Sequence, residues 1–167
     1  MARQDLGAYT DAASLSETDV VLVGAGKMGR LALEALADDT PRSVTIVNRS
    51  ATRAIDLAEA HDGTSCAWDQ RHEAVAAADL VLVATGAPDP VLTSASLPVP
   101  DAGTTLVVDV AMPRNVDPTV ADRPGYRLYD LDDLQAWTQE VRDRRAASVP
   151  RAESICEELL EDFVTWF

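Results

Sequence analysis

The chain has 167 residues, of which 47% are hydrophobic, so it can form one well-packed core but is too short for two full domains. Its formal net charge is -14. Binding to nucleic acid or to anionic lipid requires basic side chains that release counterions, so this charge opposes both kinds of partner.

Targeting segments and paired cysteines are both missing from the sequence. No apolar run approaches the ~20 residues of a membrane span, and no basic segment leads into an apolar one near residue 1. The two cysteines, Cys66 and Cys156, lack the spacing of a metal site or of a disulfide framework. We therefore expect a cytoplasmic protein with no membrane span and no metal.

The first 18 residues are polar, rich in alanine and without a clear period. We interpret residues 1–18 as a lead-in, with a short helix near Asp11–Leu15 as the only element expected there.

A glycine-rich turn follows the first apolar run, Val20–Val23. The segment Gly24-Ala25-Gly26-Lys27-Met28-Gly29 has the spacing G-x-G-x-x-G, which between a strand and a helix is typical of dinucleotide binding. The first glycine permits the turn, the second lets backbone approach a pyrophosphate, and the third packs helix on strand. The six residues are therefore candidate cofactor-binding residues, although a glycine turn between any strand and helix could imitate the pattern.

The end of the second strand carries the next candidate site. A helix is expected to run to about Ala37, and Ser43–Val47 is the second strand. NAD-binding folds place an acidic residue after this strand, but here Asn48-Arg49-Ser50 follow, with Arg53 one helical turn later. Guanidinium and hydroxyl groups would bind a ribose 2′-phosphate, so we expect NADPH. The alternative is that Asn48 and Ser50 only cap the next helix.

The middle of the chain alternates helices with apolar strands. The expected elements are a helix from Ala51 to about His61, a short strand Ser65–Trp68, a helix Asp69–Ala78 and a strand Asp79–Ala84. Thr85, Gly86 and Ala87 follow the last of these at the carboxyl edge of the sheet. We expect them to flank the ribose and nicotinamide of the cofactor, unless this is an ordinary turn.

The fifth expected strand, Thr104–Val110, must stop by Pro113, because proline lacks a backbone N–H. We include Asp109 and Ala111 among the candidate cofactor-binding residues. For Asp109 two readings stay open: a structural hydrogen-bonding group, which we favour, or a group that places the nicotinamide.

The C-terminal part is predicted to be helical. After a last strand, Arg127–Tyr129, a helix is expected from Leu131 onward, with Pro150 breaking it or starting a new one. An apolar stripe then recurs about every four residues, and it could pack on the domain or pair with a second copy as a homodimer. The stripe consists of Ile155, Leu159, Phe163 and Trp166.

These elements predict an α/β fold with a doubly wound parallel sheet of the Rossmann type and a C-terminal helical extension. We expect residues 19–147 to form the NADP-binding domain and residues 148–167 a C-terminal helix that begins a dimerisation or linker segment.

Together the motifs resemble the glutamyl-tRNA reductase family, which begins tetrapyrrole synthesis. They are, in order, Val23–Gly29, Asn48–Ser50, Ala84–Ala87, Asp109–Arg114 and Tyr129–Gln135. The resemblance implies that bound NADPH delivers hydride to a glutamyl thioester and releases glutamate-1-semialdehyde. It covers only the cofactor domain and the start of the following helix.

Two parts of that family's pattern are absent or altered. The nucleophilic cysteine of the family lies in an N-terminal catalytic domain that this chain lacks, and neither Cys66 nor Cys156 has its sequence context. We therefore name no catalytic residue and expect the chain to be inactive alone. Smaller departures are Ser50, where threonine is commoner, and Asn115, where an aspartate often stands.

Two alternatives remain. The segment from Asn48 to Arg53 is equally similar to shikimate dehydrogenase, whose substrate domain is also absent, so an NADP-dependent oxidoreductase of the shikimate or quinate dehydrogenase kind is the second reading. A standalone nucleotide-binding module that pairs through the helix after Pro150 is the third.

Overall fold

The computed structural model describes residues 15–36, 40–101, 103–140 and 142. The chain divides into two units, residues 1–131 and 132–167. Most of the lead-in and the C-terminal helix expected at 148–167, with its apolar stripe, lie outside the described residues. Within the described part of the chain, no helix combines the length and apolar character that crossing a membrane requires.

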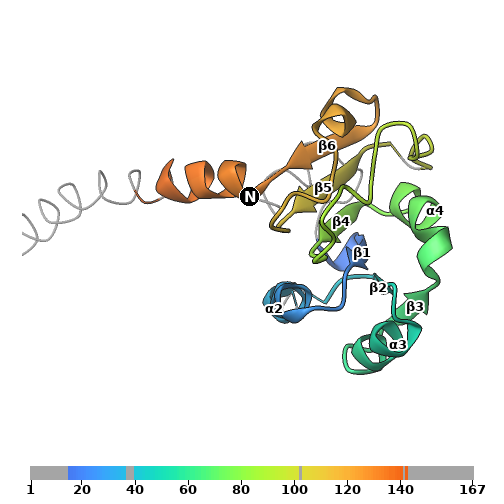
Figure 1. Cartoon of the computed structure of the whole chain (residues 1–167). Helices are drawn as coiled ribbons and strands as arrows, with labels where there is room; N and C mark the ends of the chain where they lie inside the picture. The colour runs from blue at the N-terminus through green and yellow to red at the C-terminus, as the bar shows by residue number, and fades with distance from the viewer. Residues whose placement is uncertain (1–14, 37–39, 102, 141, 143–167) are drawn as a thin grey trace, which may run out of the picture. The chain divides into compact units, whose positions relative to one another are not determined.

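A six-stranded parallel sheet forms the centre of the first unit (Figure 1). Its order is β3-β2-β1-β4-β5-β6, so the order reverses between β1 and β4. The strands are β1 (Asp19–Val23), β2 (Ser43–Val47), β3 (Thr64–Cys66), β4 (Leu80–Val83), β5 (Thr105–Asp109) and β6 (Tyr126–Tyr129). This order is that of the Rossmann fold, and it confirms the predicted fold class.

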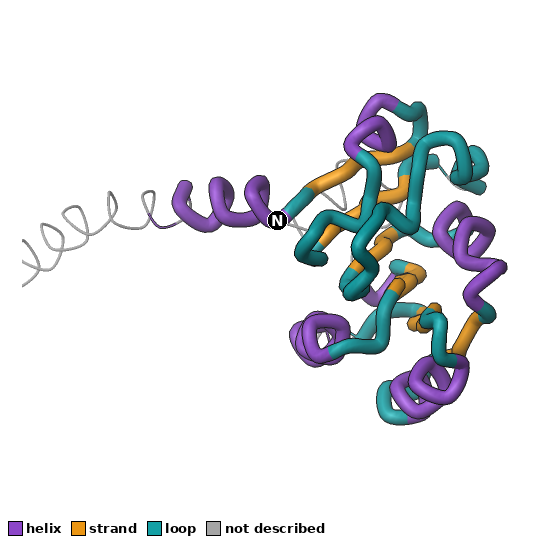
Figure 2. The backbone as a smooth tube through the Cα atoms, in the orientation of Figure 1, coloured by secondary structure: helices purple, strands orange, loops and turns teal. Residues whose placement is uncertain are grey.

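Helices cover both faces of the sheet, and Figure 1 shows α2 and α4 on opposite sides of β1. Figure 2 shows how helices and strands alternate along the backbone. The helices are α2 (Lys27–Leu36), α3 (Ala51–Glu59) and α4 (Arg71–Ala76), with the short 3-10 helices η1 (Leu15–Glu17), η3 (Trp68–Gln70) and η4 (Pro118–Asp122). A further helix covers residues 131–140, as the sequence predicts from Leu131 onward.

The core explains why the strand sequences are continuously apolar. Val21 and Val81 face one side of the sheet, where they belong to the same buried cluster as Val75 of α4. Leu22 faces the other side, where its side chain lies against Gly29 of α2. Because both faces are covered, neither face of a central strand can be polar.

Two elements predicted from the sequence have the wrong bounds. The third strand ends at Cys66 rather than Trp68, because its only partner strand ends at Val47, opposite Cys66. Trp68 instead begins η3, so the following helix is α4 at Arg71–Ala76 and not the longer Asp69–Ala78. The sequence reading also missed η4, whose start is fixed by Pro118 and by the Asp117 side chain, which accepts a hydrogen bond from the Thr119 N–H.

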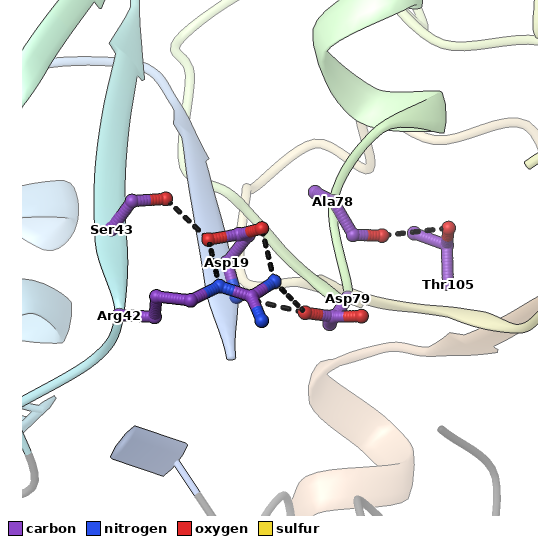
Figure 3. Close-up of polar contacts among 6 residues, drawn as sticks. All are labelled: Asp19, Arg42, Ser43, Ala78, Asp79 and Thr105. Atoms are coloured by element: carbon purple, nitrogen blue, oxygen red, sulfur yellow. Dashed lines mark hydrogen bonds and ion pairs between the residues drawn. The ribbon is translucent and has the colours of Figure 1, made fainter. Parts of the chain in front are cut away.

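A polar cluster ties three strands together at their amino-terminal ends (Figure 3). The Asp19 N–H donates to the Asp79 carboxylate at 2.8 Å. The Asp19 carboxylate accepts from Arg42 Nε at 2.9 Å and from Ser43 Oγ at 2.6 Å. The Arg42 hydrogen bond holds the pKa of Asp19 below its ordinary value, against the opposing effect of partial burial.

Asp19→Asn is expected to lower the free energy of unfolding at pH 7 and to have a smaller effect near pH 2.5. The pKa of Asp19 is lower in the folded than in the unfolded state, so its charge stabilises the fold above the unfolded pKa of about 3.9 and ceases to do so as the pH falls through the folded pKa. Urea titrations of both proteins at the two pH values measure this. A difference that stays constant with pH would show that charge is not the cause.

Candidate functional site

A hollow of about 290 Å³ lies at the carboxyl ends of the central strands, at the point where the strand order reverses. Ligands of open α/β sheets bind at this position. This volume is just below the ~300–1,000 Å³ of typical small-molecule sites, so the hollow would hold only a portion of a dinucleotide. The lining residues are Ala25, Gly26, Asn48, Arg49, Ser50, Arg53, Trp68, Ala84, Thr85, Gly86 and Ala87.

The three glycines of the turn have different surroundings. Gly24 has φ +113°, and a Cβ there would lie 2.5 Å from the Ala84 carbonyl oxygen. A Cβ on Gly29 would lie 2.4 Å from the Gly24 carbonyl oxygen. Gly26 is exposed, lines the hollow and has only the Ala84 oxygen nearby, at 3.9 Å. The absence of a side chain at Gly24 and Gly29 therefore allows close contacts between backbone segments. At Gly26 it leaves space that a ligand can occupy.

The segment after β2 is fastened to the glycine turn by Asn48. Its side-chain oxygen accepts a hydrogen bond from the Ala25 N–H at 3.4 Å, and its amide donates to the Ser50 carbonyl at 3.1 Å. The Ser50 hydroxyl accepts from the Arg53 N–H at 3.5 Å and caps α3. The capping role weighed from the sequence is thus present, and it places the same residues at a helix N-terminus that favours anions.

Arg49 and Arg53 give the hollow its charge. Both are exposed, both line it, and no acidic residue is among the lining residues. Within the described residues neither guanidinium forms an ion pair. Their N–H donors are consequently available to an anionic ligand.

The loop after β4 forms the other wall and is held by the loop after β5. The Thr85 hydroxyl accepts from the Ala87 N–H at 3.0 Å and donates to the Asn115 side-chain oxygen. The Asn115 amide donates to the Ala87 carbonyl at 2.9 Å. Asn115 is fully buried, and sequence reasoning gave it no such role.

Asp109 and Ala111, two of the expected cofactor-binding residues, do not line the hollow. The Asp109 carboxylate is 2% exposed and accepts three backbone hydrogen bonds, from Ala111 at 3.0 Å, Asn115 at 2.7 Å and Val116 at 2.8 Å. This geometry supports the structural reading of Asp109.

Lys27 and Met28 are exposed at the start of α2 and likewise lie outside the lining. The structure therefore brings together the second glycine of the turn with its neighbour Ala25, the segment after β2 and the loop after β4, but not the whole predicted set.

Cys66 ends β3 and is partly buried. Burial raises the pKa of its thiol, with further contributions from Asp69 and Glu73. A raised pKa leaves less thiolate at neutral pH, so Cys66 does not have the environment of a nucleophile.

Comparison with known proteins assigns the chain to a protein family. A family model described as shikimate / quinate 5-dehydrogenase matches residues 7–137. The chain belongs to this family. The glycine turn and the segments after β2 and β4 thus lie within a shikimate/quinate dehydrogenase-family domain.

The curated relatives of this chain include glutamyl-tRNA reductases. That of Salinibacter ruber is 68% identical over 166 residues, which cover 99% of this chain and 34% of the relative. That of Methanocaldococcus jannaschii is 35% identical over 153 residues, which cover 90% of this chain and 38% of the relative. The resemblance found in the sequence is confirmed, and the chain spans about a third of the length of these relatives.

Solved structures of glutamyl-tRNA reductases are also similar to this chain. Glutamyl-tRNA reductase from Methanopyrus kandleri is 31% identical with a TM-score of 0.76, over 89% of this chain and 38% of that one. The nucleotide-binding domain of the Thermoplasma volcanium enzyme has a TM-score of 0.61 over 77% of this chain and 85% of that one. At 18% identity this second match shows the fold alone.

Proposed function

We propose that this chain is the NADPH-binding domain of a glutamyl-tRNA reductase. The observation that carries the proposal is the pair Arg49 and Arg53 at the carboxyl end of β2, in the hollow of a Rossmann domain, with no carboxylate among the residues that line it. A carboxylate at this place would favour the ribose hydroxyls of NADH, whereas two guanidinium groups favour a 2′-phosphate.

Different residues of the hollow would bind different parts of the cofactor. Gly26 would let the pyrophosphate approach the backbone at the start of α2, and Arg49, Ser50 and Arg53 would hold the 2′-phosphate. Thr85 and Gly86 would flank the ribose next to the nicotinamide. When bound, the cofactor supplies the hydride that reduces a glutamyl thioester to glutamate-1-semialdehyde and frees the thiol.

The remainder of the reaction needs residues outside this chain. Since the chain spans about a third of its curated relatives, the thioester-forming cysteine would belong to a separate catalytic domain of a longer protein. The raised pKa of Cys66 supports a nucleophile outside this chain, because it makes Cys66 a poor candidate for that role. A homodimer formed through residues 148–167 is part of the proposal.

Arg49→Ala is expected to weaken NADPH binding by about 10- to 150-fold, the equivalent of roughly 1.5–3 kcal/mol for a charged hydrogen bond. NADH has no 2′-phosphate, so its affinity should change little. Calorimetric titration of both cofactors measures the two effects. Arg30→Ala is the matched control, because Arg30 is an exposed arginine on α2 outside the hollow. Equal affinity of the unaltered chain for NADPH and NADH would contradict the proposal.

The family model supports a second candidate, an NADP-dependent dehydrogenase acting on shikimate or quinate. Its test is the oxidation of shikimate by the full-length gene product in the presence of NADP. Turnover would favour this candidate, and reduction of charged glutamyl-tRNA without shikimate turnover would eliminate it.

A further inference from the structure

Trp68 lies in the wall of the hollow, next to the arginines proposed to bind phosphate. It is the first residue of η3, two residues after the end of the edge strand β3, and is half-buried against the core. The sequence predicts Trp68 as the last residue of a strand and does not predict its place in the wall of the hollow.

The indole of Trp68 is anchored by Arg71. The Arg71 guanidinium lies 4.8 Å from the centre of the Trp68 ring. Two hydrogen bonds fix that guanidinium, from Nε to the Val91 carbonyl at 3.2 Å and from Nη1 to the Trp68 carbonyl at 3.0 Å. The contact with Arg71 therefore restrains the ring before any ligand binds.

The same ring contacts Arg49, whose guanidinium carbon lies 5.3 Å from the ring centre. Among the described residues, this contact is the one interaction that restrains the exposed Arg49 side chain. A free arginine side chain loses rotamer entropy when it binds a phosphate, and a contact that orients it in advance reduces that loss.

We propose that Trp68 is a positioning residue that strengthens the preference for a 2′-phosphorylated adenosine by orienting Arg49. This inference rests on the proposed NADPH site. The face of the indole ring attracts the positively charged guanidinium group of Arg49. This contact does not use the guanidinium N–H groups as hydrogen-bond donors, so they stay free to donate to phosphate oxygens.

The test compares two ligands that differ only in the 2′-phosphate, 2′,5′-ADP and 5′-AMP, by calorimetric titration. Trp68→Leu is expected to lower the preference for 2′,5′-ADP about two- to five-fold, the loss of one cation–π contact near the surface. Taking the ratio of the two affinities removes any effect on adenine binding or on the folded fraction. Trp68→Phe, which keeps an aromatic face, should retain most of the preference.

A double-mutant cycle separates orientation of Arg49 from a direct effect of the indole. In the Arg49→Ala background, adding Trp68→Leu should leave the ratio unchanged, because the side chain to be oriented is gone. Trp137→Leu is the control, since Trp137 is a tryptophan of the helix over 131–140 and not of the hollow. If Trp68→Leu does not fold, Trp68→Met replaces it, because the unbranched methionine side chain adapts better to an irregular gap.

The outcomes are distinguishable. If the unaltered chain prefers 2′,5′-ADP, Arg49→Ala removes that preference and Trp68→Leu keeps it in full, the inference fails while the proposed function stands. If Trp68→Leu lowers the ratio equally with and without Arg49, orientation of Arg49 is likewise refuted. If the unaltered chain does not distinguish the two ligands, the proposed function itself fails.

Discussion

Gly24→Ala is expected to lower the free energy of unfolding by about 3–5 kcal/mol, among the largest effects of a single substitution in this chain. Its backbone has φ +113°, a conformation that residues with a Cβ rarely adopt. The added methyl would also lie 2.5 Å from the Ala84 carbonyl oxygen, so β1 and β4 would have to separate at the turn. Urea titration of the two proteins measures the difference.

Two other glycines provide matched controls for the same substitution. A Cβ on Gly86 meets no atom within 4 Å, so Gly86→Ala should leave stability nearly unchanged. Gly26→Ala should also fold, because its nearest contact would be at 3.9 Å. It should nevertheless weaken NADPH binding at least about ten-fold, because the methyl occupies the place where a pyrophosphate approaches the backbone. Similar stability losses at all three positions would contradict this reading of the turn.

The sequence was sufficient for the fold because the fold depends on patterns that are local. Continuous apolar runs such as Leu80–Val83 predict strands covered on both faces, and the glycine spacing after Val23 predicts the turn into α2. Crossover connections between parallel strands are right-handed, which limits the possible strand orders, and the glycine spacing after the first strand is typical of the Rossmann order.

The composition of the site was less predictable, because contacts between distant segments decide it. The end of β3 depends on where β2 stops, which moves Trp68 from a strand into the hollow. Asn115 reaches the loop after β4 from 30 residues away, as its hydrogen bond with Thr85 shows. Neither contact has a periodic pattern that a reading of the sequence could detect.

Asp109 illustrates the same limit for a residue that the sequence did single out. Its place at the end of a buried strand is compatible with a ligand and with a structural group. Only the direction of the side chain decides, and that direction is set by the path of the backbone through Ala111 and Asn115.

Asp109→Asn is expected to cost about 3–4 kcal/mol of stability, although the two side chains have nearly the same shape. The buried carboxylate accepts from the N–H groups of Ala111, Asn115 and Val116 with its two oxygens. An asparagine has one such oxygen, and its amide would point a donor at a backbone donor with no water to separate them. Urea titration at pH 7 measures the loss, and Asp117→Asn controls for the chemical change.

Asp117 is a suitable control because its carboxylate caps η4 near the surface, where asparagine caps almost as well. Ligand binding then separates the two readings of Asp109. If Asp109 is structural, the folded Asp109→Asn protein should bind NADPH and 2′,5′-ADP with affinities reduced by the same factor. If Asp109 instead places the nicotinamide, stability should be preserved and only NADPH binding should weaken, because 2′,5′-ADP has no nicotinamide to place.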